Sequence, residues 1–272
     1  MLQGWRPVKS GHRHHLQLKK ANSAARFVIE MWRIFGIRLW QNRSSYSMTL
    51  EQFSGFYDPS NLSPRIAVSD SSTPRVAVAI YDQQSDGSRL LIAWTGYNYP
   101  QFGYTENSPA INFQTQREYL GLLLSLILNA AISSLSELSS QHLTWVNDNE
   151  AALSWALRGR VGSASGQAAS MAVSWFQVCD NTHFHQALYL AGKEMGDIDS
   201  ESRIHEVGKS SPSLIPEKYF HLQHILDESG IMHACDPSLV HSAVKDHHTA
   251  FQDLHGRMNK LVSNLRNINN QH

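Results

Sequence analysis

Apolar and polar positions between residues 65 and 192 follow a pattern that predicts strands. The predicted strands are short and apolar, and the second of them has a period-two pattern at Val76, Val78 and Ile80. Asp86 and Gly87 form a turn signal between the second and third segments, so these two strands are expected to pair as an antiparallel hairpin. The five predicted strands are 65–70, 74–82, 89–96, 142–148 and 183–192.

Segments with helical spacing of apolar residues lie between these strands. The most apolar run of the chain, 119–132, is too short to span a bilayer and predicts a helix buried in a core, within 113–133. Further helices are predicted at 149–160, 165–179 and 195–204. This order predicts an α/β fold with a five-stranded mixed sheet, three strands antiparallel and two parallel, flanked by helices.

The pattern also divides the chain into three parts. Residues 1–64 are expected to be a helical or connection segment, with an amphipathic helix at 21–41 that needs a partner surface. Residues 65–204 hold the predicted α/β domain. Residues 205–272 show helical periodicity and are expected to form a helical C-terminal extension.

Composition adds limits to this picture. The chain has 272 residues, 42% of them hydrophobic, and its 23 Lys and Arg balance its 23 Asp and Glu, so net charge argues neither for nor against a nucleic-acid partner. The 2 cysteines lack the spacing of a disulfide framework or zinc site, which favours an intracellular location, cytoplasmic or nuclear. No apolar leader is visible at the N-terminus, and no membrane partner is expected.

Four carboxylates stand beside apolar elements that could hold them rigidly. Asp70 and Asp148 end the first and fourth predicted strands, Glu118 lies in the first turns of the long helix, and Asp199 lies on the short helix after the fifth strand. If the two strands are parallel neighbours, their ends meet at one edge of the sheet. Several carboxylates around one point are what two Mg²⁺ ions require.

Each acid also has an ordinary structural interpretation. An Asp at a strand end is most often a turn or cap residue, and Glu118 would be favourable near a helix N-terminus. Asp197 and Glu201 flank Asp199 and are interpreted as solvated helix acids. The prediction therefore depends on the joint order of the four residues.

The same segments resemble a known family. IAVSDSS, FQTQREYLGLLLSL, LTWVNDNEAALSW and LAGKEMGDIDSESR are similar to the RNase H domain of retroelement reverse transcriptase polyproteins, of the DIRS-like and LTR retrotransposon kinds. The last segment matches the family's terminal motif without a gap at Gly192, Lys193, Glu194, Asp199, Ser202 and Arg203. That register selects Asp199 rather than Asp197. The sequence departs from the family pattern at Asn147, where Thr is usual, and at Glu201, where Leu is usual.

The resemblance implies an RNase H-like fold and an endonuclease that cuts the RNA strand of RNA–DNA hybrids with two Mg²⁺ ions, Mn²⁺ being possible. Asp70 would be shared by both ions, Glu118 and Asp148 would hold one of them, and Asp199 would hold the other. The reverse transcriptase domain of the same polyprotein is the implied partner. Expected contacts to the hybrid backbone are Ser71, Ser72, Arg117, Lys193 and Arg203. The alternative is a catalytically silent RNase H-like module that binds nucleic acid or docks to a polymerase.

Overall fold

The computed structural model describes most of the region from residue 65 onward. The described residues are 65–72, 75–98, 110–133, 142–159, 164–180, 183–204, 221–235 and 247–269, with several positions between 29 and 41. The strands are β1 (Arg65–Ser71), β2 (Arg75–Gln83), β3 (Arg89–Asn98), β4 (His142–Asn147) and β5 (His183–Tyr189). The helices from residue 110 onward are α4 (Ala110–Ser133), α5 (Glu150–Arg158), α6 (Ala164–Asp180), α7 (Asp197–Ser202), α8 (His221–Ser229), α9 (Ile231–Ala234) and α11 (His247–Asn269), with a 3₁₀ turn at Gly192–Glu194.

The five strands form one mixed sheet in the order β3-β2-β1-β4-β5. β1, β2 and β3 pair antiparallel, and β4 and β5 continue the sheet parallel to β1. The predicted hairpin is confirmed: the β2–β3 turn contains Gly87 at φ 84°, and the Ser88 N–H donates to Asp86 Oδ1 at 2.8 Å. The predicted five-stranded α/β fold is therefore confirmed.

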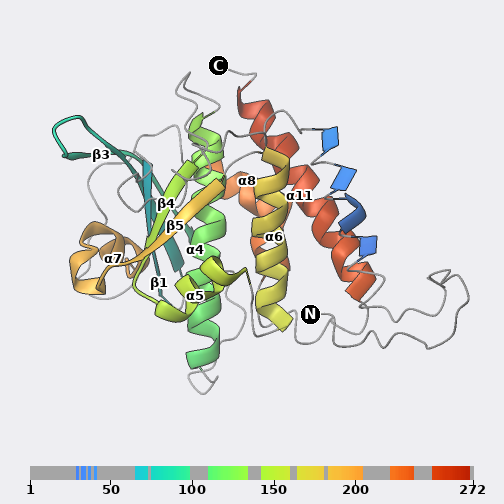
Figure 1. Cartoon of the computed structure of the whole chain (residues 1–272), viewed down its shortest axis with the longest axis horizontal. Helices are drawn as coiled ribbons and strands as arrows, with labels where there is room; N and C mark the ends of the chain where they lie inside the picture. The colour runs from blue at the N-terminus through green and yellow to red at the C-terminus, as the bar shows by residue number, and fades with distance from the viewer. Residues whose placement is uncertain are drawn as a thin grey trace, which may run out of the picture.

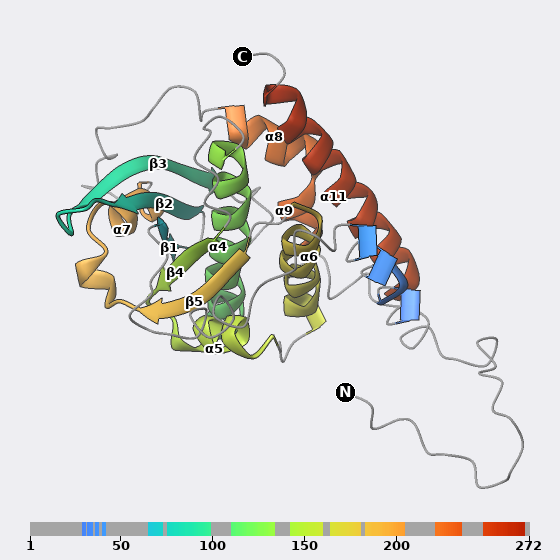
Figure 2. The same cartoon turned by 45° about the horizontal axis from the view of Figure 1, so that its top comes forward.

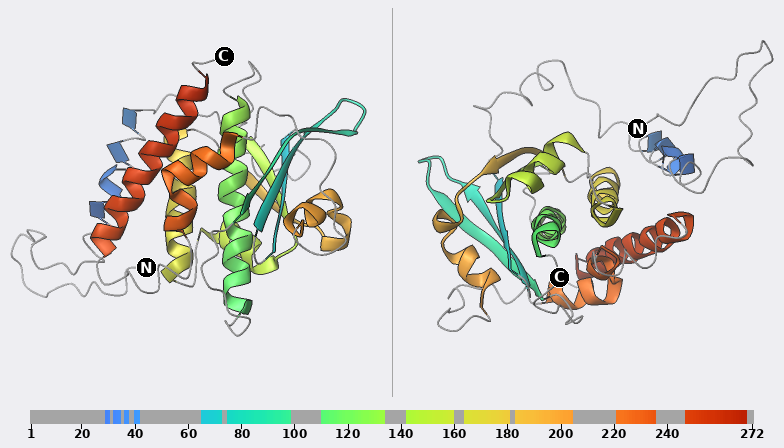
Figure 3. Two further views of the ribbon diagram at one scale, coloured as in Figure 1. Left: turned by 180° about the vertical axis from the view of Figure 1, so that it is seen from behind. Right: turned by 90° about the horizontal axis from the view of Figure 1, so that it is seen from below.

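Helices cover both faces of the sheet. Figure 1 and the right-hand view of Figure 3 show α4 on one face and α7 on the other, with α6 and α11 beyond α4. Side chains alternate between these faces, as the period-two pattern predicted. Val76, Val78 and Ile80 of β2 belong to the large core under α4, whereas Ala77 and Ala79 belong to a smaller cluster with Met195 and Ile198 beside α7.

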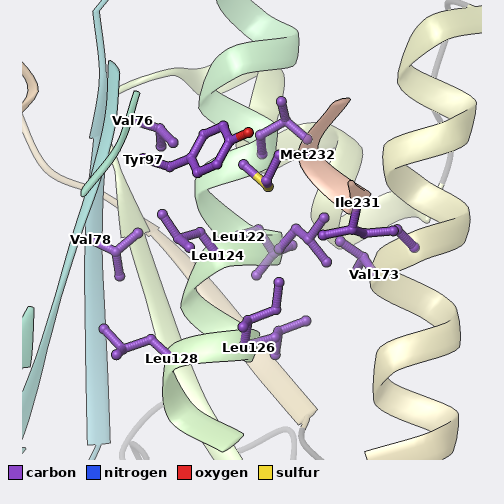
Figure 4. Close-up of a cluster of buried hydrophobic side chains, with 14 of the residues drawn as sticks. Val76, Val78, Tyr97, Leu122, Leu124, Leu126, Leu128, Val173, Ile231 and Met232 are labelled. Atoms are coloured by element: carbon purple, nitrogen blue, oxygen red, sulfur yellow. The ribbon is translucent and has the colours of Figure 1, made fainter. Parts of the chain in front are cut away.

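Helix α4 is the centre of the large core. Its apolar residues are buried all round because one side packs on the sheet and the other packs on α6 and the C-terminal helices. Figure 4 shows this layer, with Leu122 between the sheet and Val173, Ile231 and Met232. The prediction of a buried core helix is confirmed, and the described residues include no helix long and apolar enough to cross a membrane.

The C-terminal helices share this same core. Leu226 of α8, Met258 of α11 and Leu261 of α11 are completely buried in it, and Figure 2 shows α8, α9 and α11 stacked along α6 and α4. Of the predicted N-terminal helix, the described positions between 29 and 41 are helical, and Ile34 packs against the core. The connecting segment predicted at 42–64 lies outside the described residues.

Several predicted boundaries differ from the structure. Strand β5 ends at Tyr189 and is followed by the 3₁₀ turn at Gly192–Glu194, and the helix predicted over 195–204 is the shorter α7. Gly196 separates the two at φ 57°, a left-handed conformation that glycine adopts without strain. Helix α4 begins at Ala110, earlier than predicted, so Glu118 lies in its third turn.

Candidate metal centre

Strands β1 and β4 bring the first two acids together. The strands are parallel neighbours with Val68 opposite Val146, so Asp70 and Asp148 follow at equivalent places near the carboxyl ends of the two strands. Asp70 is buried, with 4% of its surface exposed, and Asp148 is partly buried at the start of the turn into α5. The predicted juxtaposition of strand-end acids is therefore present in the structure.

Helix α4 adds the third acid. Asp70, Glu118 and Asp148 each place one carboxylate oxygen within 4.8 Å of the corresponding oxygens of the other two. We refer to Asp70, Glu118 and Asp148 as the carboxylate triad. Such a group of oxygen ligands suits Mg²⁺ or Mn²⁺.

A close approach of helix to strand places Glu118 at this edge. A Cβ on Gly121, one turn after Glu118, would lie 2.5 Å from Ser69 Oγ and 2.8 Å from Ser69 Cβ. Only a residue without a side chain lets α4 pack this tightly on β1. The Gly121–Ser69 contact therefore sets the distance between Glu118 and Asp70.

Two amide side chains orient the Glu118 carboxylate. Asn147 Nδ2 donates to Glu118 Oε2 at 2.9 Å, and Gln114 Nε2 donates to Glu118 Oε1. Asn147 Nδ2 also donates to the Ser69 carbonyl at 2.9 Å, and its Oδ1 accepts from the Asn149 N–H at 2.9 Å. Asn147 thus ties Glu118, β1 and the turn that holds Asp148. The sequence marked Asn147 only as a departure from the family's Thr.

Burial and mutual repulsion disfavour the charged forms of the triad. Burial is the main cause that raises the pKa of Asp70, with the charges of Asp148 and Asp199 adding to it; the Ser202 hydrogen bond and the Arg203 charge oppose it. Burial likewise raises the pKa of Glu118 well above its ordinary value, and the Asp70 charge adds to this. Burial also raises the pKa of Asp148. A bound cation would relieve this repulsion.

Asp199 lies beside the triad rather than within the 4.8 Å group. It is on α7, and its Oδ1 accepts from Arg203 Nε at 2.7 Å. Its charge contributes to the raised pKa of both Asp70 and Asp148, so it acts on the triad electrostatically. The structure therefore brings three of the four predicted acids into one group and holds the fourth next to it, paired with Arg203.

The predicted substrate-contacting residues differ in their exposure to solvent. Lys193 and Arg203 are exposed. Ser71 and Arg117 are each 4% exposed, and Arg117 donates to Gln114 Oε1 at 2.6 Å. Ser72 is partly buried and its hydroxyl donates to the Ser202 carbonyl.

The residues that donate hydrogen bonds to the acids were not among the predicted site residues. Gln114 lies one helical turn before Glu118, a spacing that could have identified it. Ser202 donates its hydroxyl to Asp70 Oδ2, although the motif match gave it no role. The interpretation of Glu201 as a solvated acid is wrong, because its side chain is fully buried against Arg75.

Comparisons with known proteins give one similar structure. No family model matches the sequence, and no curated protein matches it. Among solved structures, the crystal structure of RNase H1 from the halophilic archaeon Halobacterium salinarum NRC-1 is 13% identical, with a TM-score of 0.35, over 52% of this chain and 97% of that chain. The five-stranded mixed sheet and its flanking helices fit an RNase H-like fold.

Proposed function

We propose that this chain is an RNase H-type endonuclease that cleaves the RNA strand of RNA–DNA hybrids with two Mg²⁺ ions, Mn²⁺ serving as a substitute. The observation that carries the proposal is the carboxylate triad at the end of parallel strands, with one carboxylate oxygen from each residue within 4.8 Å of the others. Carboxylates spread beyond about 8 Å would exclude two-metal chemistry, because the ions must lie about 4 Å apart. The triad lies well inside that limit.

The side chains at this edge fit divalent cations. Within the described ranges, no ion pair is formed by a member of the triad, so its negative charge is balanced by cations only at a distance. Carboxylate oxygens are the ligands that Mg²⁺ prefers. Two such ions supply charge stabilisation to the attacking and leaving oxygens of a phosphodiester.

Each residue has a defined part in this proposal. Asp70 would contact both ions, held in place by the Ser202 hydroxyl, and Glu118 would be oriented by Gln114 and Asn147. We assign Asp148 to the first ion with Glu118, and Asp199 to the second, which requires Asp199 to exchange its contact with Arg203 for the ion.

The exposed cations beside the site provide the substrate contacts. Lys193 and Arg203 are exposed near the triad and would bind phosphates of the hybrid backbone, as basic side chains do without reading sequence. The Ser72 hydroxyl, at the turn after β1, would also contact the hybrid backbone. Arg117 is buried and would act on the site through Gln114 rather than on the substrate.

The proposal extends to the context of the domain. The resemblance to retroelement polyproteins supports a domain at 65–204 that follows a reverse transcriptase, with residues 1–64 as its connection and residues 205–272 as a helical extension. Cleavage would then be directed to hybrids that the polymerase makes. This part of the proposal is supported by the sequence motifs alone.

Cleavage of an end-labelled RNA–DNA hybrid in Mg²⁺ tests the activity. We expect cleavage by the wild type, loss of at least about 10³-fold in Asp70→Asn and Asp148→Asn, and none in EDTA. Asp197→Asn is the matched control for Asp199→Asn, since Asp197 is exposed on the same short helix. Equal cleavage by the wild type and Asp70→Asn, or equal losses in the Asp197 and Asp199 variants, would contradict the assignment.

A further inference from the structure

A buried ion pair connects α7 to the start of β2. Arg75 Nη2, at the start of β2, contacts Glu201 Oε1 on α7, and the Glu201 side chain is fully buried. Arg75 Nη1 also donates to Asn98 Oδ1 at 2.6 Å across the β2–β3 pair. A Cβ on Gly96 of β3 would overlap the Arg75 guanidinium, so the sheet keeps a path open for this side chain.

Helix α7 is too short to hold its own position. It comprises 6 residues, and a helix of that length depends on tertiary contacts. Ile198 and Glu201 lie three positions apart on the buried side of the helix, where Ile198 joins the small apolar cluster and Glu201 meets Arg75. An apolar contact limits distance but little else. The planar Arg75 guanidinium, which contacts Asn98 through one nitrogen and Glu201 through another, also fixes direction.

The functional residues occupy the neighbouring side of the same helix. Asp199 and Ser202 are also three positions apart, each one residue beyond Ile198 and Glu201. Ser202 donates to Asp70 Oδ2, and its carbonyl accepts from Ser72. A rotation of α7 about its axis would therefore move Asp199 and Ser202 together relative to Asp70.

We propose that Arg75 and Glu201 are positioning residues that fix the rotation of α7 and thereby place Asp199 and Ser202 at the carboxylate triad. The inference rests on the proposed function in one respect, that the triad and Asp199 bind divalent cations. A buried ion pair adds little net stability over apolar side chains of the same size, because desolvation offsets the attraction. Its directionality, which apolar side chains lack, is what this site uses.

The structure provides a matched control at the far end of the sheet. Arg65 Nε contacts Asp82 Oδ1 at 2.9 Å across β1 and β2, and the Arg65 side chain is 2% exposed. Arg65 and Asp70 are at opposite ends of β1, about 17 Å apart along the strand. Asp82→Asn therefore removes the carboxylate charge that pairs with a buried arginine, at a site distant from α7.

Hydrogen exchange of the metal-free full chain tests the anchoring directly. In Glu201→Gln we expect the amides of Ser200 and Arg203, which bond within α7, to exchange about tenfold faster relative to those of α4. Arg75→Lys keeps the charge but cannot contact Asn98 and Glu201 through two fixed nitrogens, and a smaller acceleration is expected. Asp82→Asn should leave α7 unchanged relative to α4. Unaltered α7 exchange in both Glu201→Gln and Arg75→Lys would overturn the proposal.

Mn²⁺ titration by calorimetry tests the consequence for the site. We expect Glu201→Gln to weaken Mn²⁺ binding about tenfold and Asp82→Asn to leave it within about twofold. The Arg75→Gln/Glu201→Gln double variant should lose no more affinity than Glu201→Gln alone, because both changes break one pair. Faster α7 exchange with unchanged Mn²⁺ affinity would overturn the positioning role. Absence of Mn²⁺ binding by the wild type would instead contradict the proposed function. Hydrogen exchange of the α7 amides would then be the test of whether Arg75 and Glu201 hold α7 in place.

Discussion

The contact between Gly121 and Ser69 makes a quantitative prediction about how the site is built. In Gly121→Ala, the new Cβ would lie 2.8 Å from Ser69 Cβ, whereas ordinary contact begins at 3.4 Å. The helix must therefore move away from β1 by at least 3.4 − 2.8, or about 0.6 Å. Glu118 is one turn from this point and moves with the helix.

Two opposing terms set the stability of this variant. Overpacking a tight helix–strand contact costs about 1–3 kcal/mol, while Ala gains about 1 kcal/mol over Gly inside a helix. Gly256→Ala in α11 isolates the second term, because a Cβ there meets no atom within 4 Å. We expect Gly256→Ala to raise the free energy of unfolding by about 1 kcal/mol. The free energy of unfolding of Gly121→Ala should be about 1–3 kcal/mol lower than that of Gly256→Ala.

The same displacement should weaken cation binding. A misplacement of about 1 Å costs about 10²-fold in a preorganised site, so a shift of about 0.6 Å should weaken Mn²⁺ binding about tenfold. Urea unfolding and calorimetric Mn²⁺ titration of both variants measure the two effects. Ser69→Gly in the Gly121→Ala background removes both overlapping atoms and should restore part of the affinity. The reasoning is refuted if Gly121→Ala matches Gly256→Ala in stability and the wild type in Mn²⁺ affinity.

Two further predictions concern stability. Burial raises the pKa of Asp70 in the folded protein, so the fold favours the protonated carboxyl. That contribution to stability is fully present at low pH and is lost as pH rises, so metal-free Asp70→Asn should have a larger free energy of unfolding than the wild type at about pH 7.5. Thermal unfolding between pH 4 and 8 should show this difference shrink toward zero as pH falls; a constant difference would contradict the pKa shift. Met258→Ala should cost about 2–5 kcal/mol and keep one cooperative urea transition, against little change for the exposed Lys260→Ala; a separate transition of the C-terminal helices would contradict a shared core.

The fold was predictable because each element carries a strong local pattern. The period-two alternation of β2 reflects a strand with a packed layer on each side, and the apolar run of α4 reflects a helix buried all round. The sharing of the core by α8, α9 and α11 was not predictable. Helical periodicity shows that α11 has a buried side, but it does not show that this side meets α6 and α8.

The candidate site was predictable only in part, for a similar reason. Strand-end placement identified Asp70 and Asp148, and the helix offered Glu118. Glu201 could not be identified, because its partner Arg75 lies 126 residues away and nothing near either residue marks the pair. Gly196 was a visible signal that the helix begins after the predicted residue 195.

The two faces of the sheet explain why the site depends on its shortest helix. Positions 66, 68 and 70 of β1 share the face toward α7, whereas Ser69 contacts α4 at Gly121. Glu118 therefore approaches Asp70 from the α4 side, at the carboxyl end of β1, while Ser202 approaches it from the α7 side. The α4 side is fixed by a large core, but α7 has only a small apolar cluster. A buried charge at Glu201, where the resembled retroelement pattern has Leu, would compensate for that weaker side, because its partner Arg75 is also held by Asn98.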